Sequence, residues 1–199
     1  MKPKLNICFT CVGTKSLPSE LEYDSIVSPS DWWDQADKAK QTEHAIQLYE
    51  GPGYAQVHRT IIKLEEHYEV EAWIFSAGFG ILNQCDEIPG YDATFSSSAK
   101  TNKVKKADWH WWLNGVSKHK LPKGTVCAFP RSYADPYQAA FGDLDDMVLV
   151  QGTAEDRADL GVSMIRCTTS LMEKIVDNQI KEGWDLDPID WKQLRGYEV

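Results

Sequence analysis

Short apolar runs that alternate with amphipathic stretches constrain the fold of this chain most strongly. Leu5–Thr10, Val70–Ala77 and Thr125–Phe129 are rich in strand-forming residues, and each run ends close to a glycine or a proline. Between the first two runs, the apolar residues of Tyr54–Tyr68 recur near helical spacing, so a helix joins two strands and a parallel crossover is expected. The sequence therefore predicts an α/β fold with three layers: a mostly parallel central sheet of four or five strands, covered by helices on both faces.

The remaining elements follow from the same patterns. A helix is expected to start at Ser28-Pro29-Ser30-Asp31, where a capping serine precedes a proline, and to continue to Glu50. Ile88–Asp92 has the composition of a loop. Two more strands are expected over Met147–Val150 and Val162–Arg166. Three more helices are expected over Ala107–Lys120, Pro136–Phe141 and Ser170–Gly183. We expect one α/β domain over 1–199, with a helical excursion around 28–50 and a basic loop-helix insertion around 96–123.

Composition and motifs exclude several classes of protein. No apolar run approaches the roughly 20 residues of a membrane span, and Met1-Lys2-Pro3-Lys4 does not begin a secretory signal, so a soluble cytoplasmic protein without a membrane partner is expected. The five cysteines are scattered, which does not suit a disulfide framework or a zinc site. Neither phosphate-binding glycine fingerprint is present. We therefore expect no metal and no cofactor.

The charge is distributed unevenly. The chain has a net charge of −9, yet the segment Lys100–Lys123, here called the basic segment, holds seven lysines against one acid, Asp108. Ammonium groups bind phosphates and aromatic faces stack on bases, so the segment predicts contact with nucleic acid. The residues expected to make this contact are Lys103, Lys105, Lys106, Trp109 and His110. The alternative is a solvated loop before a helix that buries Trp109, Trp112, Leu113 and Val116 on one side.

Tryptophan is clustered at Trp32-Trp33 and at Trp109, Trp111 and Trp112. Trp112 is expected in the core, and one ring of the first pair is expected to be buried while the other lines a pocket. A core of this size rarely needs adjacent tryptophans twice, so at least one ring in each cluster is expected to remain available to a ligand.

Polar residues and glycines gather after the first two predicted strands, where ligands bind in open parallel sheets. Thr10, Cys11 and Lys15 follow the first strand. The second ends at Ser76-Ala77-Gly78-Phe79-Gly80, and Asp86, Tyr91 and Asp92 come next. Glycine lets backbone amides approach a ligand, lysine supplies positive charge and a carboxylate can orient water.

These loops also carry a resemblance. Cys11-Val12-Gly13-Thr14-Lys15, Leu48–Tyr54, Ser76–Leu82 and Ile88–Asp92 resemble, in order, the motifs C-G-x-x-K, L-Y-x-S-x-x-F, S-A-K-x-G-L-L and P-Y-D of the DUF6884 domain family of bacteria and phages. Gly78 stands where that family usually has lysine, which we expect to leave more room at the floor of a pocket. The pattern is distantly similar to the peroxide-stress DNA-binding protein family, to the catalytic domain of archaeosine synthase and to uracil-DNA-glycosylase-like folds. The resemblance implies work on a nucleobase in nucleic acid.

The first hypothesis is a DNA glycosylase that removes a bulky, possibly glycosylated base from phage DNA in antiphage defence. Asp92 and Lys15 are the predicted catalytic residues: Asp92 near the sugar, Lys15 and the amides around Gly78 on the leaving base. Tyr49, Phe79 or Tyr91 would stack on the flipped base. The predicted substrate-binding residues are Thr10, Cys11, Tyr49, Ser76, Gly78, Phe79, Asp86 and Tyr91. The alternatives are a DNA-binding protein without catalysis, in which these residues are structural, and an enzyme that transforms a deazaguanine-type base.

Overall fold

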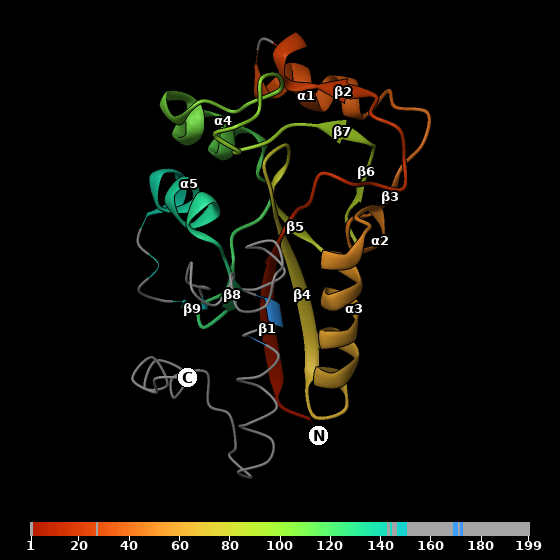
Figure 1. Ribbon diagram of the computed structural model, residues 1–199, viewed down its shortest axis with the longest axis vertical. Helices are drawn as coiled ribbons and strands as arrows, with labels where there is room; N and C mark the ends of the chain where they lie inside the picture. The colour runs from red at the N-terminus through yellow and green to blue at the C-terminus, as the bar shows by residue number, and fades with distance from the viewer. Residues whose placement is uncertain are drawn as a thin grey trace.

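The computed structural model describes residues 2–26, 28–142, 144, 147–150, 169, 170 and 172. A central sheet with the strand order β5-β4-β1-β8-β9 organises this part of the chain (Figure 1). Its strands are β1 (Lys4–Thr10), β4 (Glu69–Ser76), β5 (Gly80–Asn83), β8 (Val126–Ala128) and β9 (Val148–Val150). All neighbouring pairs are parallel except β4 and β5, so the predicted α/β fold with a mostly parallel sheet is confirmed.

Helices contact the sheet on two sides. The side chains of Phe75 and Ser76 on β4 point to opposite faces, because alternate residues of a strand do. Phe75 contacts the rings of Tyr133 and Tyr137 on α5 (Arg131–Phe141). On the other side α3 (Pro52–Glu65) packs along β4. Burial on both faces explains why β1 and β4 are continuous apolar runs in the sequence rather than alternating ones.

A second group of elements, here called the cap lobe, lies beyond the carboxyl ends of β1 and β4, at the top of Figure 1. Trp32 and Trp112 are buried in it, with ring centroids 5.3 Å apart. Trp112 Nε1 also donates to the backbone oxygen of Ala77, 2.8 Å away, which ties the cap lobe to the end of β4. The elements of the cap lobe are β2 (Leu21–Glu22), η1 (Tyr23–Ser25), α1 (Pro29–Ala36), β7 (Tyr91–Asp92), η2 (Lys106–Asp108) and α4 (Trp109–Val116).

The helix expected from Ser28 to Glu50 is wrong beyond its first turns. Ser28 caps α1 as predicted, accepting from the backbone N–H of Asp31, but α1 ends at Ala36. Residues 37–42 offer no apolar face to bury, and the chain continues through β3 (Glu43–His44) into the short α2 (Ala45–Leu48). The predicted loop at Ile88–Asp92 is confirmed for Pro89-Gly90 alone, because β6 (Glu87–Ile88) pairs with β3 and β7 pairs with β2.

Two further helix boundaries differ. α5 begins at Arg131 rather than at Pro136, and Pro136 lies inside it. Its buried side chains, including Tyr133 and Tyr137, supply the packing that offsets the backbone hydrogen bond that a proline cannot make. α4 ends at Val116 rather than at Lys120.

The strand predicted over Met147–Val150 is confirmed as β9. The strand predicted over Val162–Arg166 lies outside the described residues, and so does the helix expected over Ser170–Gly183 apart from Ser170 and Met172. In the part of the chain that is described, no helix combines the length and the apolar character that crossing a membrane requires.

Candidate functional site

A chain of buried hydroxyl groups lies where β4 meets the cap lobe. Tyr91 Oη is 2.7 Å from Ser76 Oγ and 2.8 Å from Tyr49 Oη. Ser76 Oγ also accepts from the backbone N–H groups of Gly78 and Phe79, at 3.1 and 3.0 Å. These two bonds occupy both lone pairs of Ser76 Oγ, so its proton is donated to Tyr91, and Tyr91 donates to Tyr49. Burial raises the pKa of Tyr49 and of Tyr91, so both phenols stay protonated.

This arrangement changes two expectations. The amides of Gly78 and Phe79 already donate to Ser76, so they are not free to hold a leaving base. Tyr49, Phe79 and Tyr91 are at most 1% exposed, and their rings contact other aromatic rings of the cap lobe and the core. In this structure the three rings therefore act as packing residues rather than as an open stacking surface.

The absence of a side chain at Gly78 does not leave open space. A Cβ at this position would lie 2.6 Å from two ring carbons of Tyr91 and 3.0 Å from Trp32. The room that we expected at the floor of a pocket is filled by these two rings. Gly78 thus allows Tyr91 to reach Ser76 rather than admitting a larger ligand.

Cys11 and Thr10 lie at the carboxyl end of β1, next to this cluster. Cys11 Sγ is 3.1 Å from Tyr133 Oη, and the Tyr133 hydroxyl also lies 3.1 Å from the backbone oxygen of Cys11. Thr10 Oγ1 and Tyr54 Oη are buried, and neither has a hydrogen-bond partner within the described part of the chain. Thr10 and Cys11, two of the predicted substrate-binding residues, are 1% and 3% exposed. Neither therefore presents its side chain to a ligand from solvent.

Lys15 covers the buried cluster from outside. It is half-buried, and its ammonium group lies 4.2 Å from the centroid of the Tyr91 ring and 5.9 Å from that of Tyr49. Burial lowers the pKa of Lys15, while Cys11 and the carboxylate of Asp92 act in the opposite direction. Lys15 is therefore a partly desolvated cation within electrostatic range of Asp92.

Asp92, at the end of β7, is exposed. Its Oδ2 accepts from Asn102 Nδ2 at 2.8 Å. Two residues further on, Thr94 forms a parallel bridge with Lys103. The candidate carboxylate is thus joined directly to the start of the basic segment, which sequence reasoning did not anticipate.

Asp86 lies elsewhere. β5 runs antiparallel to β4, placing Asn83 opposite Trp73 and carrying the chain away from Ser76. Asp86 Oδ2 then accepts from the backbone N–H of Asn83 at 2.7 Å and lies 2.9 Å from His119 Nε2. The strand reversal therefore carries Asp86 away from the end of β4 where Ser76 lies, and the structure does not bring Asp86 together with the other predicted binding residues.

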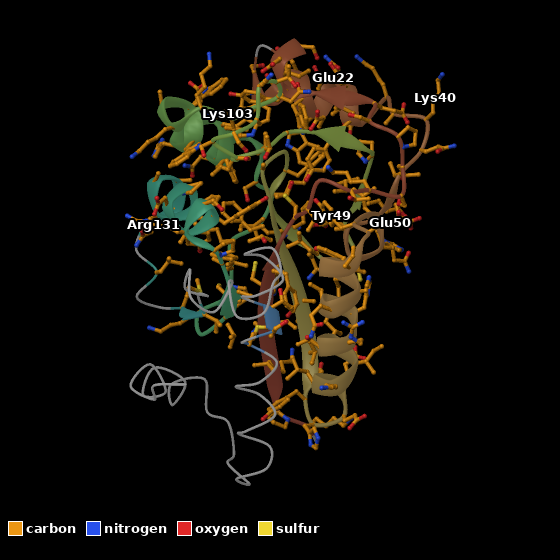
Figure 2. The ribbon with its side chains drawn as sticks, in the orientation of Figure 1. Glu22, Lys40, Tyr49, Glu50, Lys103 and Arg131 are labelled. Atoms are coloured by element: carbon orange, nitrogen blue, oxygen red, sulfur yellow. The ribbon has the colours of Figure 1, made fainter. Side chains whose placement is uncertain are left out.

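The basic segment begins on the cap lobe, where Figure 2 shows Lys103 near α4 in the upper part of the molecule. After α4 the segment leaves the cap lobe, and His119 lies beside Trp73 and Asp86. Lys105, Lys106 and His110 are exposed, whereas Lys103 is half-buried and donates to Ser97 O at 3.1 Å. Trp109 is half-buried and donates from Nε1 to Val104 O. It is therefore less available for stacking than expected.

The tryptophan clusters differ from each other. Trp32 is buried and Trp33 is half-buried, with its Nε1 bonded to Val116 O and the Lys118 ammonium 3.6 Å from its ring centroid. In the first pair, therefore, the Trp33 ring is accessible only in part, and Lys118 lies over it. In the second cluster Trp112 is buried, as predicted, and Trp111 is 50% exposed.

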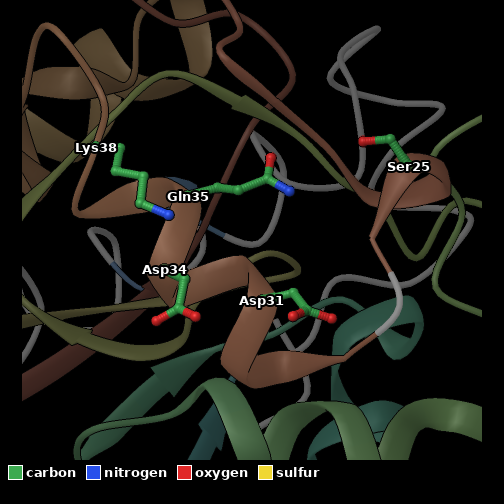
Figure 3. A pocket seen from close by; sticks show the side chains of 5 residues that line it. All are labelled: Ser25, Asp31, Asp34, Gln35 and Lys38. Atoms are coloured by element: carbon green, nitrogen blue, oxygen red, sulfur yellow. The ribbon is translucent and has the colours of Figure 1, made fainter.

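A small pocket of about 210 Å³ lies between η1 and α1 (Figure 3). It contains none of the predicted site residues and is lined by Ser25, Asp31, Asp34, Gln35 and Lys38. Its two carboxylates outnumber its one ammonium group, which suits a nucleic acid poorly, and the pocket lies outside the candidate site.

Across the described residues, no group of three or more His, Cys, Asp or Glu side chains could hold a metal ion. Neither a comparison with models of protein families nor one with curated proteins finds a match for this chain.

Proposed function

We propose that this protein is a DNA glycosylase that excises a bulky, possibly glycosylated base from modified phage DNA and leaves an abasic site. The observation that carries the proposal is the position of Lys15 and Asp92. These two charged side chains lie at the carboxyl edge of parallel strands, and Asp92 is hydrogen-bonded to the start of the basic segment. The distant likeness of the sequence pattern to uracil-DNA-glycosylase-like folds belongs to the same proposal.

The two residues suit the charges that develop when an N-glycosidic bond breaks. The sugar becomes cationic and the base leaves as an anion, so a carboxylate is needed near the sugar and a donor near the base. Asp92 stabilises the cationic sugar or orients the attacking water. Lys15 takes over the whole task of holding the leaving base, because the amides near Gly78 are occupied by Ser76.

The loop before Lys15 supports a bulky substrate. Gly13 and Thr14 are exposed, and a Cβ at Gly13 would meet no atom within 4 Å. A large substituent on the base could therefore extend over this loop without displacing protein atoms.

The direct test incubates the protein with unmodified and with heavily modified phage DNA, followed by alkaline cleavage and analysis of released bases. Abasic sites are expected in the modified DNA alone.

Asp92→Asn preserves the shape of the side chain and removes its charge, so base release should fall about 100-fold or more. The matched control is Glu22→Gln, which removes the carboxylate opposite Asp92 in the β2–β7 pair and should leave most activity. Near-normal base release by a folded Asp92→Asn protein would reassign the catalytic carboxylate.

A DNA-binding protein without catalysis is the second candidate. It is favoured by the burial of Tyr49, Phe79 and Tyr91, which places these residues in the core. Binding releases no base, so DNA binding without abasic sites in any modified DNA would select this candidate over the glycosylase.

A further inference from the structure

Trp111 is an aromatic side chain of the cap lobe that the proposed chemistry does not use, and its ring centroid lies 6.2 Å from that of Trp112. Its side chain is 50% exposed, while the other large exposed apolar side chain in the described residues, Ile62, lies on α3. The buried residues of α4 are Trp112, Leu113 and Val116, so Trp111 projects from the opposite side of the helix. A single exposed ring is ordinary on a protein surface, so the residues near it in the chain decide whether it contacts a partner.

The helix that carries Trp111 is fixed at several points. Trp112 Nε1 donates to Ala77 O at 2.8 Å, Asn114 Nδ2 donates to Ala140 O at 2.8 Å, and Trp33 Nε1 donates to Val116 O at 3.1 Å. These bonds connect α4 to the end of β4, to α5 and to α1. The ring is consequently presented on a rigid element, so a partner that stacks on it pays little ordering entropy.

The charges around Trp111 select the chemistry of the partner. Lys105, Lys106 and His110 are exposed within six residues of it. The one acid of the basic segment, Asp108, lies 3.4 Å from Tyr23 Oη, which donates to it, so part of its charge is engaged within the protein. An exposed aromatic ring that follows exposed lysines closely in the chain is complementary to a nucleic acid strand, in which phosphates alternate with bases.

We propose that Trp111 is a stacking platform for an unpaired base of DNA. This inference rests on the proposed function and refines it, because an unpaired base is what a base-excising enzyme creates when it opens a duplex. Trp111, rather than the half-buried Trp109, then supplies the aromatic face of the basic segment. A paired base offers its face only to its stacking neighbours, so Trp111 should distinguish single-stranded from duplex DNA.

The test measures binding of the full chain to a labelled single-stranded oligonucleotide of thymidines and to an unmodified duplex of the same length, by fluorescence anisotropy. Trp111→Ala should weaken single-strand binding about 5- to 100-fold and duplex binding less than about 2-fold. Trp111→Phe should retain most affinity, and Ile62→Ala, the matched exposed control, should change neither. The salt dependence should be unchanged in Trp111→Ala but reduced when Lys105 and Lys106 are neutralised, by about 0.9 per lost phosphate contact.

The proposal is overturned if Trp111→Ala binds the single strand like the unchanged protein, if it loses equal affinity for the duplex, or if the unchanged protein binds neither DNA. Base release from modified DNA is measured on the same preparations. Binding that depends on Trp111 without any base release refutes the glycosylase and leaves the platform standing. Base release with binding that is insensitive to Trp111 refutes the platform alone.

Discussion

Replacing Tyr91 by phenylalanine tests the buried hydroxyl chain with the loss of one oxygen. Tyr91→Phe removes the bond between Ser76 and Tyr91 and the bond between Tyr91 and Tyr49, in a place that solvent does not reach, and leaves Ser76 with Tyr49 as a hydroxyl neighbour. The loss of two buried hydrogen bonds at about 1–1.5 kcal/mol each should lower the free energy of unfolding by about 2–3 kcal/mol. For a chain of this length, that corresponds to a decrease of about 4–10 °C in Tm.

Tyr54→Phe is the matched control. Tyr54 is as buried as Tyr91 and contacts the same Tyr49 ring, but its hydroxyl has no hydrogen-bond partner within the described residues. Removing an unpaired buried hydroxyl should be neutral or stabilise the fold by up to about 1 kcal/mol. The same chemical change is thus expected to have opposite or very different effects at two neighbouring tyrosines.

Urea unfolding followed by circular dichroism gives both free energies, provided that the slopes with urea agree between variants. A double-mutant cycle of Tyr91→Phe with Ser76→Ala should give a coupling energy of about 1–2 kcal/mol, since the two hydroxyls share a bond. Equal costs for Tyr91→Phe and Tyr54→Phe, or a cost below about 0.5 kcal/mol for Tyr91→Phe, would refute the hydrogen-bond assignment.

Two further predictions concern the same edge of the sheet. Gly78→Ala places a Cβ 2.6 Å from the ring of Tyr91 and should lower the free energy of unfolding by about 1–3 kcal/mol. Gly13→Ala is the control, because its Cβ meets no atom within 4 Å and should be tolerated. Equal urea midpoints for the two variants would contradict this prediction. Because burial lowers the pKa of Lys15, its ammonium should lose its proton, and base release should decline, at lower pH than an exposed lysine would. Lys15→Arg stays charged, so its pH profile should remain flat to higher pH, and identical profiles would exclude Lys15 as the charged donor. Stability depends on pH in the opposite direction from base release. The unfolded chain binds the Lys15 proton more tightly than the folded chain does, so the contribution of Lys15 to the free energy of unfolding rises with pH between the lowered pKa of the folded state and 10.5.

The strands that could be predicted from the sequence are those buried on both faces. β1, β4 and β8 appear as apolar runs because helices or loops cover them on each side. β2, β3, β6 and β7 have two residues each, which is too short for any periodicity to appear. β5 could not be predicted from the sequence. It begins at Gly80, whose φ of 67° allows the tight turn after β4, and a glycine at this position is equally typical of a loop.

The candidate site could be predicted as a set of loops but not as a geometry. Lys15 and Asp92 lie within electrostatic range of each other beyond the carboxyl ends of the parallel strands. The position of Asp86 could not be predicted, because nothing in the sequence between Ser76 and Asp86 indicates that β5 runs antiparallel to β4. The exposure of Trp111 was available from the sequence, since the helical spacing of Trp109, Trp112, Leu113 and Val116 turns position 111 outward.

Asn102 joins the candidate site to the basic segment, and its replacement shows how tightly the two are connected. Its backbone has a positive φ of 51°, its Nδ2 donates to Asp92 at 2.8 Å, and its Oδ1 accepts from the backbone N–H of Asp24 at 3.0 Å. Asn102→Gly removes both side-chain bonds but accepts the left-handed backbone, so it should cost about 2–4 kcal/mol of unfolding free energy.

Asn102→Ala loses the same bonds and adds the strain of a Cβ in the left-handed region, so it should be less stable than Asn102→Gly by about 1 kcal/mol. Either variant removes the side-chain bond that joins the basic segment to Asp92, while the backbone bridge between Lys103 and Thr94 remains, so DNA affinity should fall in the two variants alike. Urea unfolding and anisotropy measure the two effects separately. Equal stability of the glycine and alanine variants would show that the positive φ carries no strain, and unchanged DNA affinity would show that the basic segment holds its position without Asn102.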